Sequence, residues 1–91
     1  MANTKSAKKR IRQTEKRTAR NRLYRSSART YIKRTRQLIA AGELDQAEEF
    51  AQKAYSTLDK AARKRILHPR NAARRKSRLM AALAEARSAQ S

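Results

Sequence analysis

The sequence predicts an all-α protein, a three-helix up-down-up bundle whose long first helix projects beyond the bundle. Two observations lead to this prediction. The 91 residues contain a single glycine, Gly42, and a single proline, Pro69, and the three segments between these breakers are rich in strong helix formers. The connections at these breakers are short, so neighbouring helices are expected to run antiparallel. A chain of this length has room for one small domain, which is expected to span residues 1–91.

The first helix is expected over about residues 4–41. Either Asn3 or Thr4 can cap its free amides, and Gly42 supplies a left-handed stop after Ala41. At 1.5 Å per residue this helix is about 57 Å long, whereas the second reaches only ~33 Å and can cover only its back half. Residues 5–22 must therefore project beyond the bundle.

The second helix is expected over about residues 44–66 and the third over about 69–87. Four acids, beginning with Glu43, open the second helix and four bases, beginning with Lys60, close it, as the helix dipole favours. Proline is accepted at a first helical position, and His68, which precedes it, is disfavoured in helical geometry. The third helix therefore begins at Pro69, and residues 88–91 are expected to fray.

Apolar spacing predicts which face of each helix is buried. The first face comprises Ala28, Tyr31, Ile32, Thr35, Leu38 and Ile39, and the second comprises Leu44, Ala47, Ala51, Ala54, Tyr55, Leu58, Ala61 and Ala62. The third comprises Ala72, Ala73, Leu79, Met80, Leu83 and Ala86. Since 18 of the 35 apolar residues are alanine, little bulky apolar surface is available, and a domain this small is expected to be marginally stable.

Positive charge is concentrated in two regions of the chain, whose net charge is +18. Residues 1–36 carry 14 bases and one acid, residues 37–59 one base and five acids, and residues 60–91 ten bases and one acid. The predicted arrangement gathers both basic regions at one pole and the acids near Gly42 at the other. An ordinary salt-bridged surface alternates its signs, so these clusters indicate a polyanion-binding site. Six bases of the projecting segment share one third of the helix circumference: Lys5, Lys8, Lys9, Arg12, Lys16 and Arg20.

Folded RNA is the polyanion that the pattern favours. A membrane-binding helix needs a broad apolar face, which residues 5–25 lack, and a mitochondrial transit peptide would not explain the second basic cluster at residues 60–78. Tyr24, Tyr31 and Tyr55 lie on or beside buried faces and only Phe50 is loosely placed, so the exposed stacking platforms of single-strand binders are missing. The charge alone equally permits a nonspecific DNA-compacting protein. A leucine zipper needs more heptads than the two available before Gly42.

The residues needed for catalysis or for metal binding are absent from the sequence. The chain has no cysteine and one histidine, and His68 is interpreted as a helix cap or an RNA contact. A phosphate-binding loop needs several glycines, and Glu48 and Glu49 diverge by about 100° on a helix. We therefore expect no enzymatic activity, no cofactor, no metal and no small-molecule substrate.

Two stretches of the chain are similar to the bacterial small-subunit ribosomal protein S20 family. They are the opening residues 1–13, MANTKSAKKRIRQ, and residues 68–79, HPRNAARRKSRL. The similarity extends over nearly the whole chain and includes the position of Gly42. One departure is Pro69, which stands where the family commonly has lysine, so a phosphate contact is not carried over to that position.

The resemblance implies a three-helix bundle inserted among RNA helices of the small ribosomal subunit, in the cytoplasm, with other ribosomal proteins touching it only peripherally. It also implies a role in assembly, with early binding to the 5′ domain of the RNA and contact with the long helix near its 3′ end. Carried over to matching positions, the implied RNA contacts are Lys5, Lys8, Lys9, Arg10, Arg12, Lys16, His68, Asn71, Arg74, Lys76, Ser77 and Arg78. The charge clusters add Arg17, Arg20, Arg22, Arg25, Arg29, Arg63, Lys64, Arg70 and Arg75 as predicted contacts.

The projecting segment has no apolar face of its own to pack. We therefore expect the free protein to hold a loose bundle with a frayed N-terminal segment, which becomes continuous helix when phosphates neutralise its charge.

Overall fold

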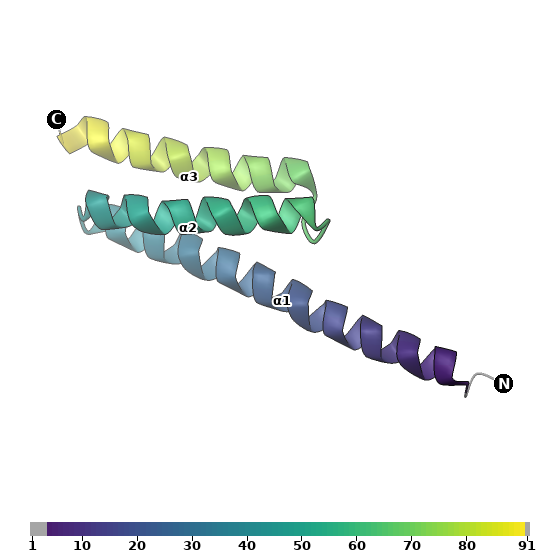
Figure 1. Cartoon of the computed structure of the whole chain (residues 1–91). Coiled ribbons are helices and arrows are strands. Elements are labelled where there is room, and N and C mark those ends of the chain that lie inside the picture. The colour runs from purple at the N-terminus through teal and green to yellow at the C-terminus, as the bar shows by residue number, and fades with distance from the viewer. Residues whose placement is uncertain (1–3, 91) are drawn as a thin grey trace.

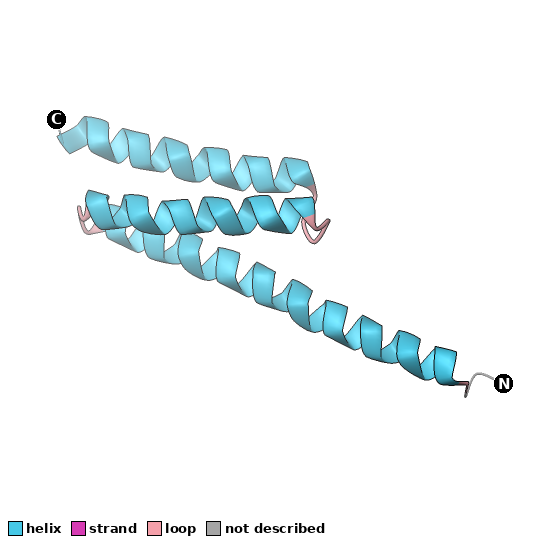
Figure 2. Cartoon of the chain, in the orientation of Figure 1, coloured by secondary structure: helices cyan, strands magenta, loops and turns pink. Residues whose placement is uncertain are grey.

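The computed structural model describes residues 4–90, which form three helices joined by two short turns (Figures 1 and 2). They are α1 (Lys5–Ala40), α2 (Leu44–Arg63) and α3 (Pro69–Gln90). Helix α2 runs back along the second half of α1, and α3 runs beside α2 in the opposite direction to it (Figure 1). The predicted all-α, up-down-up fold with a projecting first helix is confirmed.

The first half of α1 extends beyond the other two helices and gives the molecule a length of 68 Å (Figure 1). Thr4 caps this helix, because its Oγ1 accepts a hydrogen bond from the Ala7 amide at 3.4 Å. The other candidate cap, Asn3, lies outside the described residues. We refer to residues 5–22 as the arm: all its residues are exposed except Ala7 and Asn21, which are half-buried. Among residues 4–90 the arm has no packing partner, as its lack of an apolar face predicts.

Helix α1 ends at Ala40 and is terminated by a Schellman motif at Gly42. Gly42 adopts the left-handed conformation with φ 78°. Its amide donates to the Ile39 carbonyl at 3.1 Å, and the next amide, that of Glu43, donates to the Leu38 carbonyl at 2.9 Å. The glycine stop predicted from the sequence is confirmed.

Helix α2 ends at Arg63, so the prediction that it reaches residue 66 is wrong. A second Schellman motif ends it, with Arg65 in the left-handed position at φ 61°. The Arg65 amide donates to the Ala62 carbonyl at 3.0 Å, and the Ile66 amide donates to the Ala61 carbonyl at 2.8 Å. The turn places Ile66 in the core, where it is 5% exposed, and this burial offsets the cost of a left-handed arginine.

Helix α3 continues to Gln90, so the prediction that residues 88–90 fray is wrong. Arg87 forms ion pairs with Asp45, at 3.5 Å, and with Glu48. The Gln90 side-chain amide donates to the Gly42 carbonyl at 3.3 Å. These contacts attach the last turn of α3 to the start of α2 and to the α1–α2 turn. Ser91 lies outside the described residues.

The core lies along α2, which packs against both other helices, whereas α1 and α3 touch each other much less. The predicted buried faces of α1 and α2 are confirmed. On α3, Ala72, Leu79 and Leu83 are buried, but Ala73 and Met80 are exposed, contrary to prediction. Because α3 packs mainly on one neighbour, its buried stripe is narrow, and the residue one step beyond each buried position turns about 100° away.

Candidate nucleic-acid interface

The arm presents nine bases and one acid, all of them exposed. No ion pair joins any of these bases to an acid among the residues 4–90 that the structure describes. A shallow hollow along the arm is lined by Gln13 and five of the six bases predicted to share one face. The arm is therefore a continuous cationic surface with no competing partner in the described chain, and every predicted contact on it is accessible to an RNA.

The basic junction between α2 and α3, residues 63–78, lies beside the middle of α1. The Arg25 Nη2 atom donates to the Ile66 carbonyl at 2.9 Å, and the Lys64 ammonium lies 6.0 Å from the centroid of the Tyr24 ring. The junction carries eight bases and no acid. Its contacts with α1 bring the second basic cluster alongside the first, at the root of the arm.

His68 caps α3. Its Nδ1 accepts a hydrogen bond from the Arg70 amide at 3.1 Å, and its carbonyl accepts from the Asn71 and Ala72 amides at 2.9 and 3.1 Å. The interpretation of His68 as a helix cap is confirmed. The side chain remains exposed, so the cap leaves it open to a partner as well.

Besides Lys64 and His68, two more of the predicted contacts, Arg25 and Lys76, already interact within the protein. Arg25 holds the Ile66 carbonyl, and Lys76 forms an ion pair with Asp59 at 3.2 Å and lies 5.7 Å from the centroid of the Tyr55 ring. Burial raises the pKa of the Tyr55 hydroxyl above 10.0, and the Glu48 carboxylate raises it further. Arg25 thus links the junction to α1, and Lys76 links α3 to α2 through an exposed ion pair.

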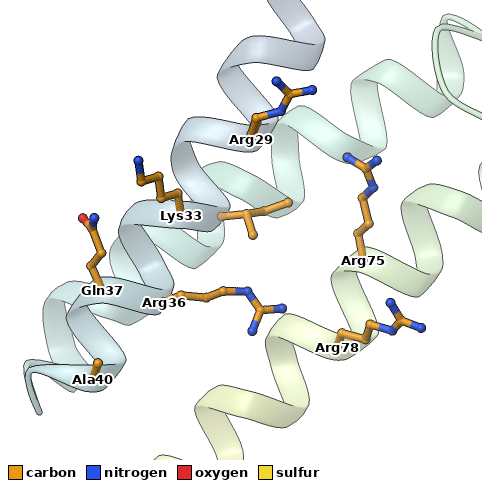
Figure 3. A pocket seen from close by; sticks show the side chains of 8 residues that line it. Arg29, Lys33, Arg36, Gln37, Ala40, Arg75 and Arg78 are labelled. Carbon is orange, nitrogen blue, oxygen red and sulfur yellow. The ribbon is translucent and has the colours of Figure 1, made fainter.

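A groove of about 620 Å³ separates α1 from α3 (Figure 3). It is lined by the apolar side chains of Ile32 and Ala40, by Gln37 and by five cations: Arg29, Lys33 and Arg36 of α1 with Arg75 and Arg78 of α3. In Figure 3, Arg36 extends from α1 towards α3, where Arg75 and Arg78 lie. We call this surface the inter-helix groove.

Of the five groove cations, Arg29, Arg75 and Arg78 are among the contacts predicted from the sequence, and Lys33 and Arg36 are not. Residues 29, 33 and 36 share one helix face at spacings of four and three, and that spacing was the available signal. This spacing indicates a site only because α3 lies across the groove from these residues, and no local sequence pattern predicts that position of α3. At the junction, the left-handed backbone conformation of Arg65 was not predicted. An arginine carries no sequence signal for a left-handed turn.

The acids gather at the opposite pole, around the α1–α2 turn. Glu43, Asp45, Glu48 and Glu49 are all exposed there, and Arg87 pairs with two of them. The charge of the molecule is therefore polarised along its length, which orients it in the field of a polyanion before contact.

Within residues 4–90, no cluster of three or more His, Cys, Asp or Glu side chains could hold a metal ion. Nor does any helix in that range combine the length and the hydropathy needed to cross a membrane.

Nearly the whole chain is similar to proteins of the bacterial small ribosomal subunit. The family model described as Ribosomal protein S20 matches residues 2–84. A relative from Thermomicrobium roseum, named small ribosomal subunit protein bS20, is 55% identical over 80 residues, which are 88% of this chain and 81% of the relative. The proteins of the same name from Dehalococcoides mccartyi strain 195 and Roseiflexus sp. strain RS-1 are each 51% identical, over 94% and 98% of this chain and 98% and 97% of their own lengths. The chain therefore belongs to the ribosomal protein S20 family.

Proposed function

We propose that this protein binds the RNA of the small ribosomal subunit through phosphate contacts and aids assembly of the subunit. Its family makes it a structural constituent of the small ribosomal subunit in the cytoplasm, and not an enzyme. The RNA contacts and the assembly role are what the proposal adds. Contacts with other ribosomal proteins are proposed to be peripheral.

The observation that carries the proposal is the arm. Its nine bases project from the bundle on a helix that nothing in the described chain covers, and a surface of unpaired like charges has no stabilising role in the fold. RNA phosphates supply the missing counter-charge, and each contact releases a condensed counterion. Arginine, with its planar fork, can hold one phosphate with two hydrogen bonds.

Recognition through phosphates fits the placement of the aromatic side chains. Tyr24, Tyr31, Phe50 and Tyr55 are each half-buried, and Phe50 packs against Tyr31 with ring centroids 6.4 Å apart. Splayed bases need exposed rings to stack on. A folded RNA, whose shape places phosphates along a helix ridge, is the better ligand for these cations.

The assembly role rests on the shape of the molecule. The arm and the bundle present cations along a molecule 68 Å long, so one chain can contact RNA segments that are well separated. A protein that neutralises two such segments lowers the electrostatic cost of bringing them together. The proposed sites are the arm, the junction and the nearby bases of α1, which are the contacts predicted from the sequence.

Incorporation into small subunits tests the proposal. A variant with glutamine at Lys5, Lys8, Lys9, Arg12, Lys16 and Arg20 should incorporate poorly during reconstitution with small-subunit RNA. The control variant Glu43→Gln/Glu49→Gln, altered at the acidic pole, should incorporate normally. Competition between folded ribosomal RNA and duplex DNA completes the test: equal affinity for the two would indicate nonspecific DNA compaction and would overturn the proposal.

A further inference from the structure

The inter-helix groove differs from the arm in how its charges are assembled. The arm is one continuous segment of the chain, so its cations stay near one another whether or not α3 is docked. The groove takes Arg29, Lys33 and Arg36 from α1 and Arg75 and Arg78 from α3. These two sets come together only when α3 is docked in the bundle.

The five groove cations have no ion-pair partner within residues 4–90, and no acid lines the groove. On α3, by contrast, Lys76 and Arg87 both pair with acids of α2. Like charges that face each other across a gap repel, and α3 indeed packs mainly on α2 and touches α1 much less. The groove is thus a weak point of the bundle that an anion would strengthen.

We propose that the inter-helix groove is a second RNA-phosphate site, separate from the arm, whose occupation holds α3 against α1. The inference rests on the proposed RNA-binding function. It adds two residues that were not among the predicted contacts, Lys33 and Arg36, and it adds a link between binding and the packing of α3.

The lining of the groove fits a nucleic-acid strand. Arg36 reaches towards α3 from one side, and Arg75 and Arg78 line the other (Figure 3), so a phosphodiester ridge in the groove has arginine residues on both sides. The groove also exposes apolar surface from Ile32 and Ala40, which suits the less polar face of a ribose.

A ligand that binds only the docked state stabilises that state, and the gain grows with the logarithm of the ligand concentration above the dissociation constant. Phosphate in the groove should therefore raise the stability of the folded chain and protect the amides of α3 from exchange. Phosphate on the arm, which contacts α1 alone, leaves the packing of α3 unaffected. This difference separates the two sites experimentally.

The test is thermal unfolding of the full chain in inorganic pyrophosphate, with ionic strength held constant by chloride and unfolding followed by circular dichroism. The unfolding midpoint should rise with the logarithm of the pyrophosphate concentration once this exceeds the dissociation constant. In Arg36→Gln/Arg78→Gln the pyrophosphate concentration needed for a given rise in the midpoint should increase roughly tenfold or more, as expected for the loss of charge-assisted hydrogen bonds. The control Arg20→Gln/Arg74→Gln removes the same charge from the same two helices outside the groove lining and should keep the response.

Equal responses of the two variants would overturn the proposal, since the stabilisation would then come from diffuse screening. Amide exchange gives a second readout: pyrophosphate should slow exchange in α3 of the wild type and the control only. Arg36 and Arg78 are exposed, so the variant should fold, and each single variant can replace it if it does not. RNA affinity distinguishes failure of this proposal from failure of the proposed function. If the control variant loses affinity for RNA but pyrophosphate gives no stabilisation that depends on the groove residues, the RNA-binding function stands and only the groove site is contradicted.

Discussion

The Arg25 guanidinium donates a hydrogen bond of 2.9 Å to the Ile66 carbonyl, 41 residues further along the chain. Ile66 is the residue at which the α2–α3 turn enters the core, and it is 5% exposed. This bond fixes the basic junction to the root of the arm. It also gives one of the predicted RNA contacts a role within the fold, and the consequences of both roles can be measured.

Replacing Arg25 should destabilise the fold. Arg25→Met keeps most of the side-chain volume but leaves the part-buried Ile66 carbonyl unpaired, which should cost about 1–3 kcal/mol of unfolding free energy. Urea unfolding at fixed salt measures this. Arg22→Met is the matched control, since Arg22 is exposed on the arm and its removal should change the free energy little. Equal losses in the two variants would show that the hydrogen bond contributes nothing.

Replacing Arg65 with glycine should stabilise the fold. Arg65 occupies a left-handed position at φ 61°, which costs an L-residue roughly 1–2 kcal/mol and costs glycine almost nothing. Glycine also gains entropy in the unfolded chain, so the net gain in unfolding free energy should be about 0.5–1 kcal/mol. In Arg65→Ala the left-handed strain persists, and no such gain should appear. A destabilised glycine variant would contradict the role given to this turn.

The stability of the fold should fall at alkaline pH through Tyr55. Its pKa is raised in the folded chain above 10.0, first by burial and then by Glu48, so its contribution is complete below pH about 10 and declines as the unfolded chain begins to ionise. Tyr55→Phe removes this titration while the lysines titrate in both proteins. The free energy of unfolding, measured against pH, should therefore fall less steeply in Tyr55→Phe. Parallel curves for the two proteins would contradict the shift.

The sequence predicted those features that local chemistry determines. Thr4, Gly42 and Pro69 mark helix ends because a hydroxyl, a residue without Cβ and a residue without an amide hydrogen have strong positional preferences. Arg65 has no such preference. Its left-handed turn follows from the burial of Ile66, which is a tertiary effect.

The candidate site likewise has one part that the local sequence determines and one part that tertiary packing determines. The arm could be predicted because its charge and its lack of an apolar face are properties of one segment. The inter-helix groove could not, because Arg36 acquires its neighbours Arg75 and Arg78 only through the packing of three helices. The end of α3 was missed for the same reason, since Gln90 is held by the carbonyl of Gly42, a residue 48 positions away.

The arm should gain helix on binding RNA. Its bases recur four residues apart, as at Lys5 and Lys9 or Lys8 and Arg12, and each like-charged pair at that spacing destabilises a helix by roughly 0.2–0.5 kcal/mol. Phosphates remove this repulsion. Circular dichroism of the chain with and without small-subunit RNA should show a gain in helicity, which a peptide of residues 5–22 alone should reproduce with short RNA. Unchanged helicity would mean that the arm is already rigid in the free protein.

The central claim is that the cations of the arm and the junction bind the phosphates of a folded RNA. The most direct test is the affinity for small-subunit RNA as a function of salt concentration. If about eight phosphates are contacted, raising the salt from about 50 to 200 mM should weaken binding by roughly 10³ to 10⁵, and the arm variant with six glutamines should show a clearly shallower slope. An affinity that does not change with salt, or an unchanged slope in the arm variant, would contradict the claim.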